Sequence, residues 1–319
     1  MVTNFKYSHL LESCTLCPHK CKVNRFKSRK GFCKASNVME ISTILPHYGE
    51  EPPISGDKGS GTIFFKYCNM RCVYCQNFQI SQECSSLPLK NEDAVKLGDC
   101  MLKLQSLGCH NINLVSPTIW SPHIIDALSS VRTKENGLTI PVIYNSGGYE
   151  DPETIKLLDG FIDIYMPDMR YSRNESAYKY SGIKNYVENN RKSLIEMYRQ
   201  VGGLKTDKNG IAISGLMVRL LILPDNVSEI KESLDFIKFE LSTDIYISIM
   251  SQYRPLYRAP CYPEINRLIN YNEYFKIVNY TEKLGFYSGA IQEFEEHTRE
   301  KDLFIPDFED KDVFKFKKK

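Results

Sequence analysis

Short apolar runs alternate with amphipathic stretches along residues 61–291, and this alternation is the feature that most restricts the fold. Each apolar run is followed by a turn and then by residues with helical spacing. Such a pattern is typical of a parallel sheet whose strands are joined by helices. The predicted strands are residues 61–67, 111–116, 140–145, 163–167, 216–223 and 244–250. The predicted helices are residues 92–107, 121–134, 152–158, 191–201 and 227–240.

These units predict an α/β fold, a partial (β/α)6 barrel similar to a TIM barrel. A helix at 272–284 and a short run at 287–291 are expected to close or flank it. We expect residues 1–60 to hold a four-cysteine segment and a loop leading into the first strand. Residues 61–295 then form the barrel and residues 296–319 a C-terminal extension. Glu50 and Glu51 lie in the Pro- and Gly-rich loop, where we expect both carboxylates to be solvated, with a position facing the site as the alternative.

Three cysteines, Cys68, Cys72 and Cys75, follow the first predicted strand with the spacing C-x3-C-x2-C. In a barrel of parallel strands the active site lies where the loops after the strands converge. Three thiolates in one such loop can bind three irons of a four-iron four-sulfur cluster and leave the fourth iron open. The structural alternative is a closed zinc site, for which this spacing is a poor match.

A second set of cysteines precedes the barrel: Cys14, Cys17, Cys21 and Cys33, with the spacing C-x2-C-x3-C-x11-C. The residues between these thiols are rich in Lys, Arg and Gly, so the segment cannot build an apolar core. We therefore expect a bound metal to stabilise its fold. Structural zinc and an auxiliary iron–sulfur cluster both fit the spacing. Unmetallated thiols are the third alternative.

The overall charge excludes some function classes. There are 41 Lys and Arg residues and 39 Asp and Glu residues, which gives a formal net charge of +2. The chain therefore lacks the large excess of positive charge that is typical of proteins that bind nucleic acid. No uncharged apolar run approaches the roughly 20 residues of a membrane helix, and the N-terminal residues lack the apolar part of a signal peptide. Clustered cysteines without secretory context indicate metal binding in a reducing compartment. We therefore expect a cytoplasmic protein that binds no membrane. The dispersed thiols are interpreted as incidental: Cys84, Cys100, Cys109 and Cys261.

The motif CNMRCVYC, with Tyr74 before its last cysteine, resembles the signature of radical S-adenosylmethionine (SAM) enzymes. The resemblance implies that the amino and carboxylate groups of SAM chelate the open iron. It also implies that one electron from the reduced cluster cleaves SAM to methionine and a 5′-deoxyadenosyl radical, which removes a hydrogen atom from a substrate. A reducing partner such as flavodoxin or ferredoxin would supply the electron, and Tyr74 would be a cofactor-binding residue.

Polar residues after the next two strands are candidates for contacts to SAM. Ser116 and Thr118 offer oxygen acceptors to its ammonium group, with a plain turn as the alternative. At this place the glycyl-radical activating enzymes carry a Gly-Gly-Glu segment, from which the sequence departs. Asn145 precedes a Gly-Gly pair and is a candidate for the ribose hydroxyls, with a turn-forming role as the alternative.

Two charged residues complete the candidate set. Asp168 ends the fourth strand and is expected to contact the ribose or the substrate, or else to form a salt bridge with Arg170. Arg219 lies among apolar residues of the fifth strand and needs an anion. That anion is either the carboxylate of SAM or an internal carboxylate, Asp168 or Asp225.

Longer segments extend the resemblance beyond the cysteine motif. Together with both cysteine sets, HYGEEPPISGDKGSGTIFF, NINLVSPT, IPVIYNSGGYE and DIYMPDMRY resemble the group named for its similarity to pyruvate formate-lyase activating enzyme. This implies a radical SAM oxidoreductase acting on a peptide or protein, including the glycine Cα of a glycyl radical enzyme. A shared fold does not fix a substrate. The alternatives are a radical SAM enzyme that modifies a small metabolite or a different peptide, and a non-enzymatic iron–sulfur or zinc module.

Overall fold

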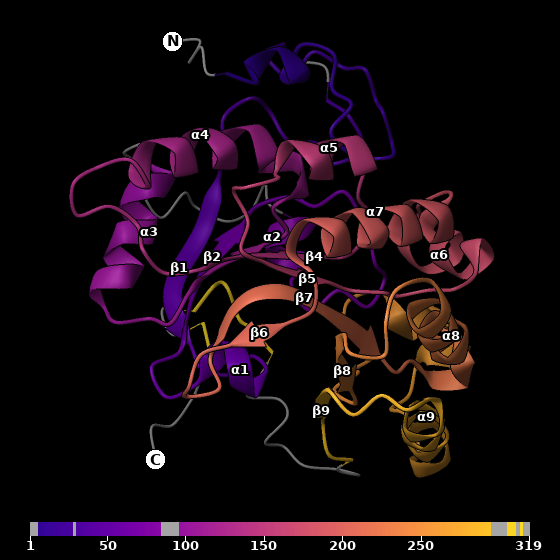
Figure 1. Ribbon diagram of the computed structural model, residues 1–319. Coiled ribbons are helices and arrows are strands. Elements are labelled where there is room, and N and C mark those ends of the chain that lie inside the picture. The colour runs from indigo at the N-terminus through magenta and orange to yellow at the C-terminus, as the bar shows by residue number, and fades with distance from the viewer. Residues whose placement is uncertain (1–5, 28–29, 84–95, 295–304, 311–312, 315–319) are drawn as a thin grey trace.

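The computed structural model describes residues 6–27, 30–83, 96–294, 305–310 and 313–314 (Figure 1). Its centre is one curved sheet in which neighbouring strands follow chain order. Along the sheet lie β1 (Ile41–His47), β2 (Ser60–Phe65), β3 (Ile112–Val115), β4 (Val142–Ser146), β5 (Ile164–Pro167), β7 (Ala212–Leu221), β8 (Tyr246–Met250) and β9 (Gly289–Ile291). From β2 to β9 these neighbours are parallel, whereas β1 is antiparallel to β2 and the short β6 (Lys205–Thr206) is antiparallel to β7.

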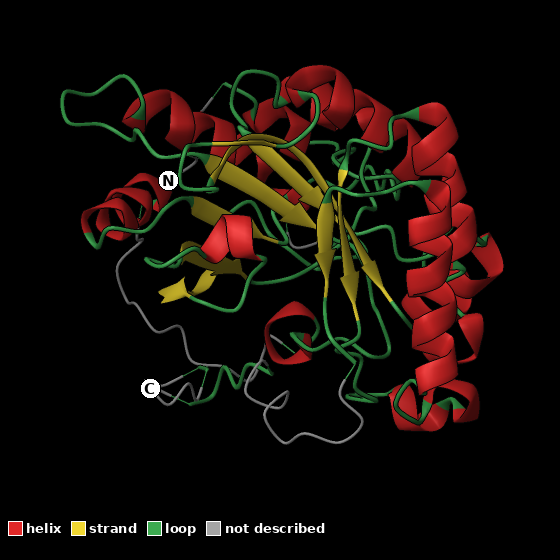
Figure 2. Cartoon of the chain, turned by 60° about the horizontal axis from the view of Figure 1, so that its bottom comes forward, coloured by secondary structure: helices red, strands yellow, loops and turns green. Residues whose placement is uncertain are grey.

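Helices join the parallel strands and lie along the outside of the curved sheet (Figure 2). These outer helices are α3 (Leu97–Ser106), α4 (Ser121–Val131), α5 (Pro152–Leu157), α6 (Asn174–Ser181), α7 (Tyr186–Val201), α8 (Ile230–Glu240) and α9 (Tyr271–Leu284). Two short helices lie elsewhere: α2 (Phe78–Ser81) follows the cysteine loop, and α1 (Pro52–Ser55) connects the antiparallel strands β1 and β2 and carries Ile54 into the barrel interior. Each of β2, β3, β4, β5, β7 and β8 is followed by a helix before the next parallel strand. The predicted α/β class and the partial (β/α)6 barrel are therefore confirmed.

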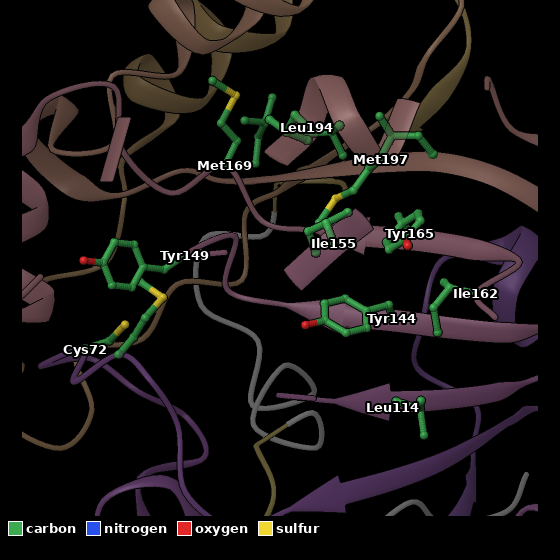
Figure 3. Packing of buried hydrophobic residues seen from close by; sticks show 14 of the residues in the cluster. Cys72, Leu114, Tyr144, Tyr149, Ile155, Ile162, Tyr165, Met169, Leu194 and Met197 are labelled. Atoms are coloured by element: carbon green, nitrogen blue, oxygen red, sulfur yellow. The ribbon is translucent and has the colours of Figure 1, made fainter. Parts of the chain in front are cut away.

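The two faces of each strand pack against different partners. Tyr144 of β4 and Tyr165 of β5 lie opposite each other in register and point toward the outer helices, with ring centroids 5.8 Å apart (Figure 3). Because side chains alternate along a strand, the intervening Ile143 and Ile164 face the barrel interior. There they pack against Ile54 of α1, which is fully buried. Burial on both faces explains why the strands read as continuous apolar runs.

Some elements differ from the sequence-based expectation, and other predictions fall on residues that the structure does not describe. Residues 41–47, predicted to be part of a loop, form the edge strand β1, and Pro46 is compatible with an edge because it removes one donor from the ladder. The helix α6 was not predicted, because few apolar residues mark its sequence. The first four residues of the predicted helix 92–107 lie outside the described residues, and so does Cys84.

The C-terminal extension contributes to the barrel wall where it is described. Phe308, Val313 and Phe314 are buried against Phe64 of β2 and Ile80 of α2. Gln79 fixes this segment by donating to the carboxylate of Asp307 (3.1 Å) and accepting from the backbone N–H of Phe308 (3.0 Å). The described part of residues 296–319 therefore packs on the barrel beside its first parallel strand.

Candidate active site

A cavity of about 200 Å³ lies at the carboxyl ends of the parallel strands. All three cysteines of the C-x3-C-x2-C motif line it, together with residues that follow four other strands. The polar and charged residues of its wall include His47, Glu50, Ser116, Asn145, Asp168, Arg170, Arg219, Gln252 and Arg254. The fold thus brings the cysteine loop and the predicted strand-end residues to one space.

Each motif cysteine has a hydrogen-bonding partner at its sulfur. The backbone N–H of Met70 points to Sγ of Cys68 (3.4 Å), and the hydroxyl of Ser181 donates to Sγ of Cys72 (3.0 Å). The hydroxyl of Ser81 lies 3.3 Å from Sγ of Cys75. Such donors stabilise thiolates, which is the form that binds iron.

Burial works against ionisation of these thiols in the absence of a metal. It raises the pKa of Cys68 to about 12 and that of Cys75 to about 11, and the neighbouring Cys72 adds to both shifts. Iron binding would therefore displace protons and neutralise charges that are costly to bury. Thiols that are largely removed from water and have polar hydrogen-bonding groups at their sulfurs are suited to binding a cluster.

The cysteine loop is held in place from α6. The backbone N–H groups of Arg71 and Val73 donate to the carbonyls of Ser181 (3.0 Å) and Tyr180 (2.8 Å). A chain of hydroxyls also runs from Tyr74 through Tyr171 to Ser181, with oxygen separations of 2.6 Å and 2.8 Å. Sequence reasoning included Tyr74 but missed Ser181, whose hydroxyl then reaches Cys72.

A buried charge network forms the inner part of the cavity. The guanidinium of Arg219 lies 3.6 Å from Glu50, 3.2 Å from Glu51 and 4.0 Å from Asp168. Asp168 also forms an ion pair with Arg170. Burial alone would raise the pKa of Glu50, but its contact with His47 and the charge of Arg219 keep that pKa below its ordinary value.

The expectation that Glu50 and Glu51 are solvated is wrong. The side chains of both are largely buried, because α1 carries Ile54 into the barrel interior and the preceding acids enter with it. Asn113 of β3 donates to Glu50 (2.9 Å), which anchors this carboxylate to the sheet. The internal ion pairs considered for Arg219 and Asp168 are present, except that Glu50 and Glu51 take the place of Asp225.

The two residues predicted after the second strand lie in different surroundings. Ser116 lines the cavity in a left-handed conformation (φ +60°), and its N–H donates to the carbonyl of Asn145 (2.9 Å). Thr118 is buried, and its hydroxyl donates to Glu150 (2.8 Å) instead of lining the cavity. Asn145 lies at the cavity wall, where its Oδ1 is 3.5 Å from Arg219.

Glycine is required where the ends of β4 and β5 approach each other. Gly148 has φ +74°, and a Cβ atom there would lie 2.0 Å from the carbonyl oxygen of Asp168. Any larger residue would therefore push the two strand ends apart. The Gly-Gly pair after Asn145 thus sets the position of Asp168 in the cavity.

The second cysteine set converges at a separate small cavity of about 10 Å³. Cys14, Cys17, Cys21 and Cys33 all line it. Burial raises the pKa of Cys17 and of Cys33, and the neighbouring thiols add to both shifts. The guanidinium of Arg25 is buried beside the cavity, where it donates to the carbonyls of Ser36 and Ile119. Four thiols at one point are the donor set that a metal or cluster requires.

Neither cysteine set has the geometry of a single-ion site. Among the described residues, no group of three or more His, Cys, Asp and Glu side chains is arranged to hold one metal ion. The thiolates of an iron–sulfur cluster bind different irons, so they need not point at one centre.

Comparisons with known proteins support a family assignment. No protein-family model matches the chain. It is 31% identical over 287 residues to "Uncharacterized protein MJ0674" of Methanocaldococcus jannaschii, covering 86% of this chain and 76% of that protein. Solved structures with some similarity include HydG, a maturase of FeFe-hydrogenase (15% identity, 70% of this chain, 48% of that chain, TM-score 0.46). Another is anSMEcpe with bound AdoMet (12% identity, 68% of this chain, 55% of that chain, TM-score 0.45).

The chain spans about half the length of these two solved structures. Among the described residues no helix is both long and apolar enough to cross a bilayer. The identity and coverage of the archaeal relative are sufficient to place the sequence: the chain belongs to the family of the Methanocaldococcus jannaschii protein MJ0674.

Proposed function

We propose that the chain is a radical SAM enzyme that binds a four-iron four-sulfur cluster through Cys68, Cys72 and Cys75. The supporting observation is that these three thiols, each with a hydrogen-bonding partner at its sulfur, line one cavity at the carboxyl ends of parallel strands. When bound and reduced, such a cluster supplies the electron that cleaves SAM and yields a radical able to remove a hydrogen atom from a substrate.

The residues of the chain would bind and orient SAM in this cavity. Asp168 and Glu50 offer carboxylates to an ammonium group or to ribose hydroxyls, and Asn145 and Ser116 offer neutral polar groups. A contact between Arg219 and the carboxylate of SAM stays a prediction. Its three acidic neighbours support a second role, in which the guanidinium holds those carboxylates in place.

We further propose that the substrate is a peptide or protein, as in the group named for similarity to pyruvate formate-lyase activating enzyme. The alternative is a small metabolite. In the test, a candidate peptide carries deuterium at its target carbon, including a glycine Cα. If the substrate is a peptide or protein, this deuterium should appear in 5′-deoxyadenosine. Transfer from a labelled metabolite with no transfer from peptides would favour the alternative.

The first test is SAM cleavage by anaerobically reconstituted protein reduced with dithionite. We expect 5′-deoxyadenosine and methionine from the wild type and neither product from Cys72→Ala. Cys261→Ala is the matched control, because Cys261 is exposed and lies outside both cysteine cavities. If the wild type and Cys72→Ala gave equal product, the enzyme proposal would fail and a non-enzymatic metal module would remain.

The content of the N-terminal site is a separate question with a separate measurement. We propose that Cys14, Cys17, Cys21 and Cys33 hold an auxiliary cluster, with zinc as the alternative if the four thiols close around one ion. Iron, sulfide and zinc analysis of Cys68→Ala/Cys72→Ala/Cys75→Ala protein reports on this site alone. Iron with sulfide indicates a second cluster, and one zinc per chain indicates a structural site.

A further inference from the structure

A second hollow lies on the outer side of the cysteine loop. Its volume is about 220 Å³, and residues from four separate parts of the chain line it, among them Phe32, Ser81 and Tyr257. Cys33 of the N-terminal set and Cys68 of the motif both reach it, and both are partly exposed. Since Cys68 also lines the inner cavity, this sulfur lies between the inner site and the outer surface.

The rim of this hollow is strongly basic. Lys30, Lys34, Arg71 and Arg258, which we call the basic rim, are all exposed, and no acidic residue lines the hollow among the described residues. Within the described chain none of these four cations forms an ion pair with a carboxylate. A formal net charge of only +2 for the whole chain makes this local concentration of charge a distinct feature.

Aromatic contacts hold two of the rim cations in place. The guanidinium of Arg71 lies over the ring of Phe32 (4.5 Å) and donates to the carbonyl of the same residue (2.7 Å). The guanidinium of Arg258 lies over Tyr257 (5.1 Å), whose ring stacks on Phe78 (4.9 Å). Positioned charges lose less conformational entropy on binding than free lysines do, so this surface is prepared for an anionic partner.

We propose that the basic rim is the docking surface for an acidic electron-transfer protein that reduces the cluster. This inference rests on the proposed radical SAM function and names its reducing partner. The partner would cover the outer side of Cys68 while the inner cavity stays open to SAM and substrate. One electron passes from the reduced flavin or iron–sulfur centre of the partner, which is oxidised, to the cluster, which is reduced, and no atom is transferred.

Charge complementarity predicts how this complex forms. A surface with four uncompensated cations steers an acidic protein toward it and raises the association rate at low ionic strength. The screening length falls to about 8 Å at physiological salt, so the affinity should drop steeply as salt is added. A partner recognised mainly by apolar contacts would lack this salt dependence.

The test compares two double charge reversals that change the net charge equally. Lys30→Glu/Arg258→Glu alters the rim, whereas Lys208→Glu/Lys276→Glu alters exposed lysines on β6–β7 and α9, outside the hollow. Purified acidic flavodoxin is the probe. Its Kd for the reconstituted enzyme is measured by calorimetry across a salt series, and reduction of the cluster is followed by its absorbance.

We expect the rim variant to bind flavodoxin about tenfold more weakly at low salt, with the control close to wild type. The ratio of flavodoxin-driven to dithionite-driven reduction should fall by a similar factor, because dithionite needs no docking surface. Equal Kd values and equal ratios in both variants would overturn the proposal. So would tighter, rim-dependent binding of a DNA oligonucleotide than of flavodoxin, because that result assigns the rim to nucleic acid.

Reduction by dithionite, which needs no docking surface, distinguishes a failure of the docking proposal from a failure of the proposed radical SAM function. If dithionite-reduced wild type forms no 5′-deoxyadenosine, the radical SAM proposal fails. If the product forms with dithionite but rim reversal leaves flavodoxin binding unchanged, only the docking surface is wrong.

Discussion

His19 joins the two cysteine sets through a hydrogen bond from its ring nitrogen Nε2 to the backbone carbonyl of Asn69, at 2.9 Å. The same ring stacks on Phe32 with centroids 3.9 Å apart, and the N–H of Phe32 points to Sγ of Cys21 (3.5 Å). Burial lowers the pKa of His19, so its ring is neutral. A neutral imidazole carries one N–H group, and here Nε2 donates it to Asn69. The segment that carries the N-terminal cysteines therefore supports the motif loop directly.

Replacing His19 with leucine should loosen the motif loop. The variant keeps apolar volume but loses the donor to Asn69, at a cost of about 1–2 kcal/mol in the free energy of unfolding. Iron retention at the motif site should fall as well. His123→Leu is a matched control, because that half-buried ring also contacts a backbone carbonyl, that of Asn37 (2.8 Å), away from the motif loop. Equal iron loss in both variants would contradict a specific supporting role for His19.

Removing the positive charge of Arg219 should strongly destabilise the protein at neutral pH. Arg219→Leu leaves Glu50, Glu51 and Asp168 without their shared guanidinium, and breaking a buried ion pair from one side costs about 3–5 kcal/mol. This loss of stability should be smaller at pH 5, because Glu50 no longer has the cation that lowers its pKa against the effect of burial and can then bind a proton. Urea unfolding at pH 7.5 and pH 5 measures both effects.

Arg199→Leu is the contrasting variant for this experiment. Arg199 also contacts two carboxylates, but it is exposed, so water and salt screen its interactions and the loss should be much smaller. The loss in the free energy of unfolding could be as small for Arg219→Leu as for Arg199→Leu, or it could be the same at both pH values. Either result would argue against a buried charge network.

Glu150 should make the stability of the protein depend on pH between about 4.5 and 7. Burial raises its pKa from 4.5 to about 7, while the hydroxyls of Thr118 and Tyr144 and the nearby Ser146 oppose the shift, and the charge of Asp151 adds to it. The folded state thus binds the proton more tightly than the unfolded state does. Its stabilising effect is complete below pH 4.5 and is lost as the pH rises to about 7.

The loss amounts to at most about 3 kcal/mol, the equivalent of the shift in pKa. Glu150→Gln keeps an acceptor for the two hydroxyls and cannot ionise, so its stability should be higher than that of the wild type at pH 7.5 and similar at pH 4.5. Chemical unfolding at a series of pH values gives the two curves. Parallel curves for wild type and variant would show that Glu150 does not titrate in this range.

Shortening Phe314 should open the inner cavity to reagents. This side chain lines the cavity, lies 4.3 Å from the ring of His47 and packs on Phe64. In metal-free protein, Phe314→Ala should let a thiol reagent modify the motif cysteines several-fold faster. Phe239→Ala is the control, because Phe239 on α8 is already 74% exposed. Unchanged rates in Phe314→Ala would mean that the C-terminal segment does not restrict access.

The strands of the barrel were predictable because each is buried on both faces and therefore appears as an apolar run in the sequence. Convergence of Ser116, Asn145, Asp168 and Arg219 followed from the rule that parallel strands end at one edge. Local sequence could not show that Glu50 is buried. Its burial depends on where α1 enters the barrel, a contact between residues far apart in the chain.

The same reason accounts for the residues that were missed or placed differently. Glu150 lies in the segment between β4 and α5, and it accepts hydrogen bonds from Thr118 and Tyr144, so the Thr118 hydroxyl is directed to Glu150 and not to the cavity. Ser181 at the end of α6 has no sequence motif, and only the packing of that helix against the cysteine loop brings its hydroxyl to Cys72.

The position of Phe314 also has a consequence for how the protein is made. Phe314 is synthesised long after Phe64 and the cysteine loop, so the wall of the cavity stays incomplete in a nascent chain until the segment around Phe314 has left the ribosome. Cofactor loading can take place during this interval without any opening motion of the finished fold.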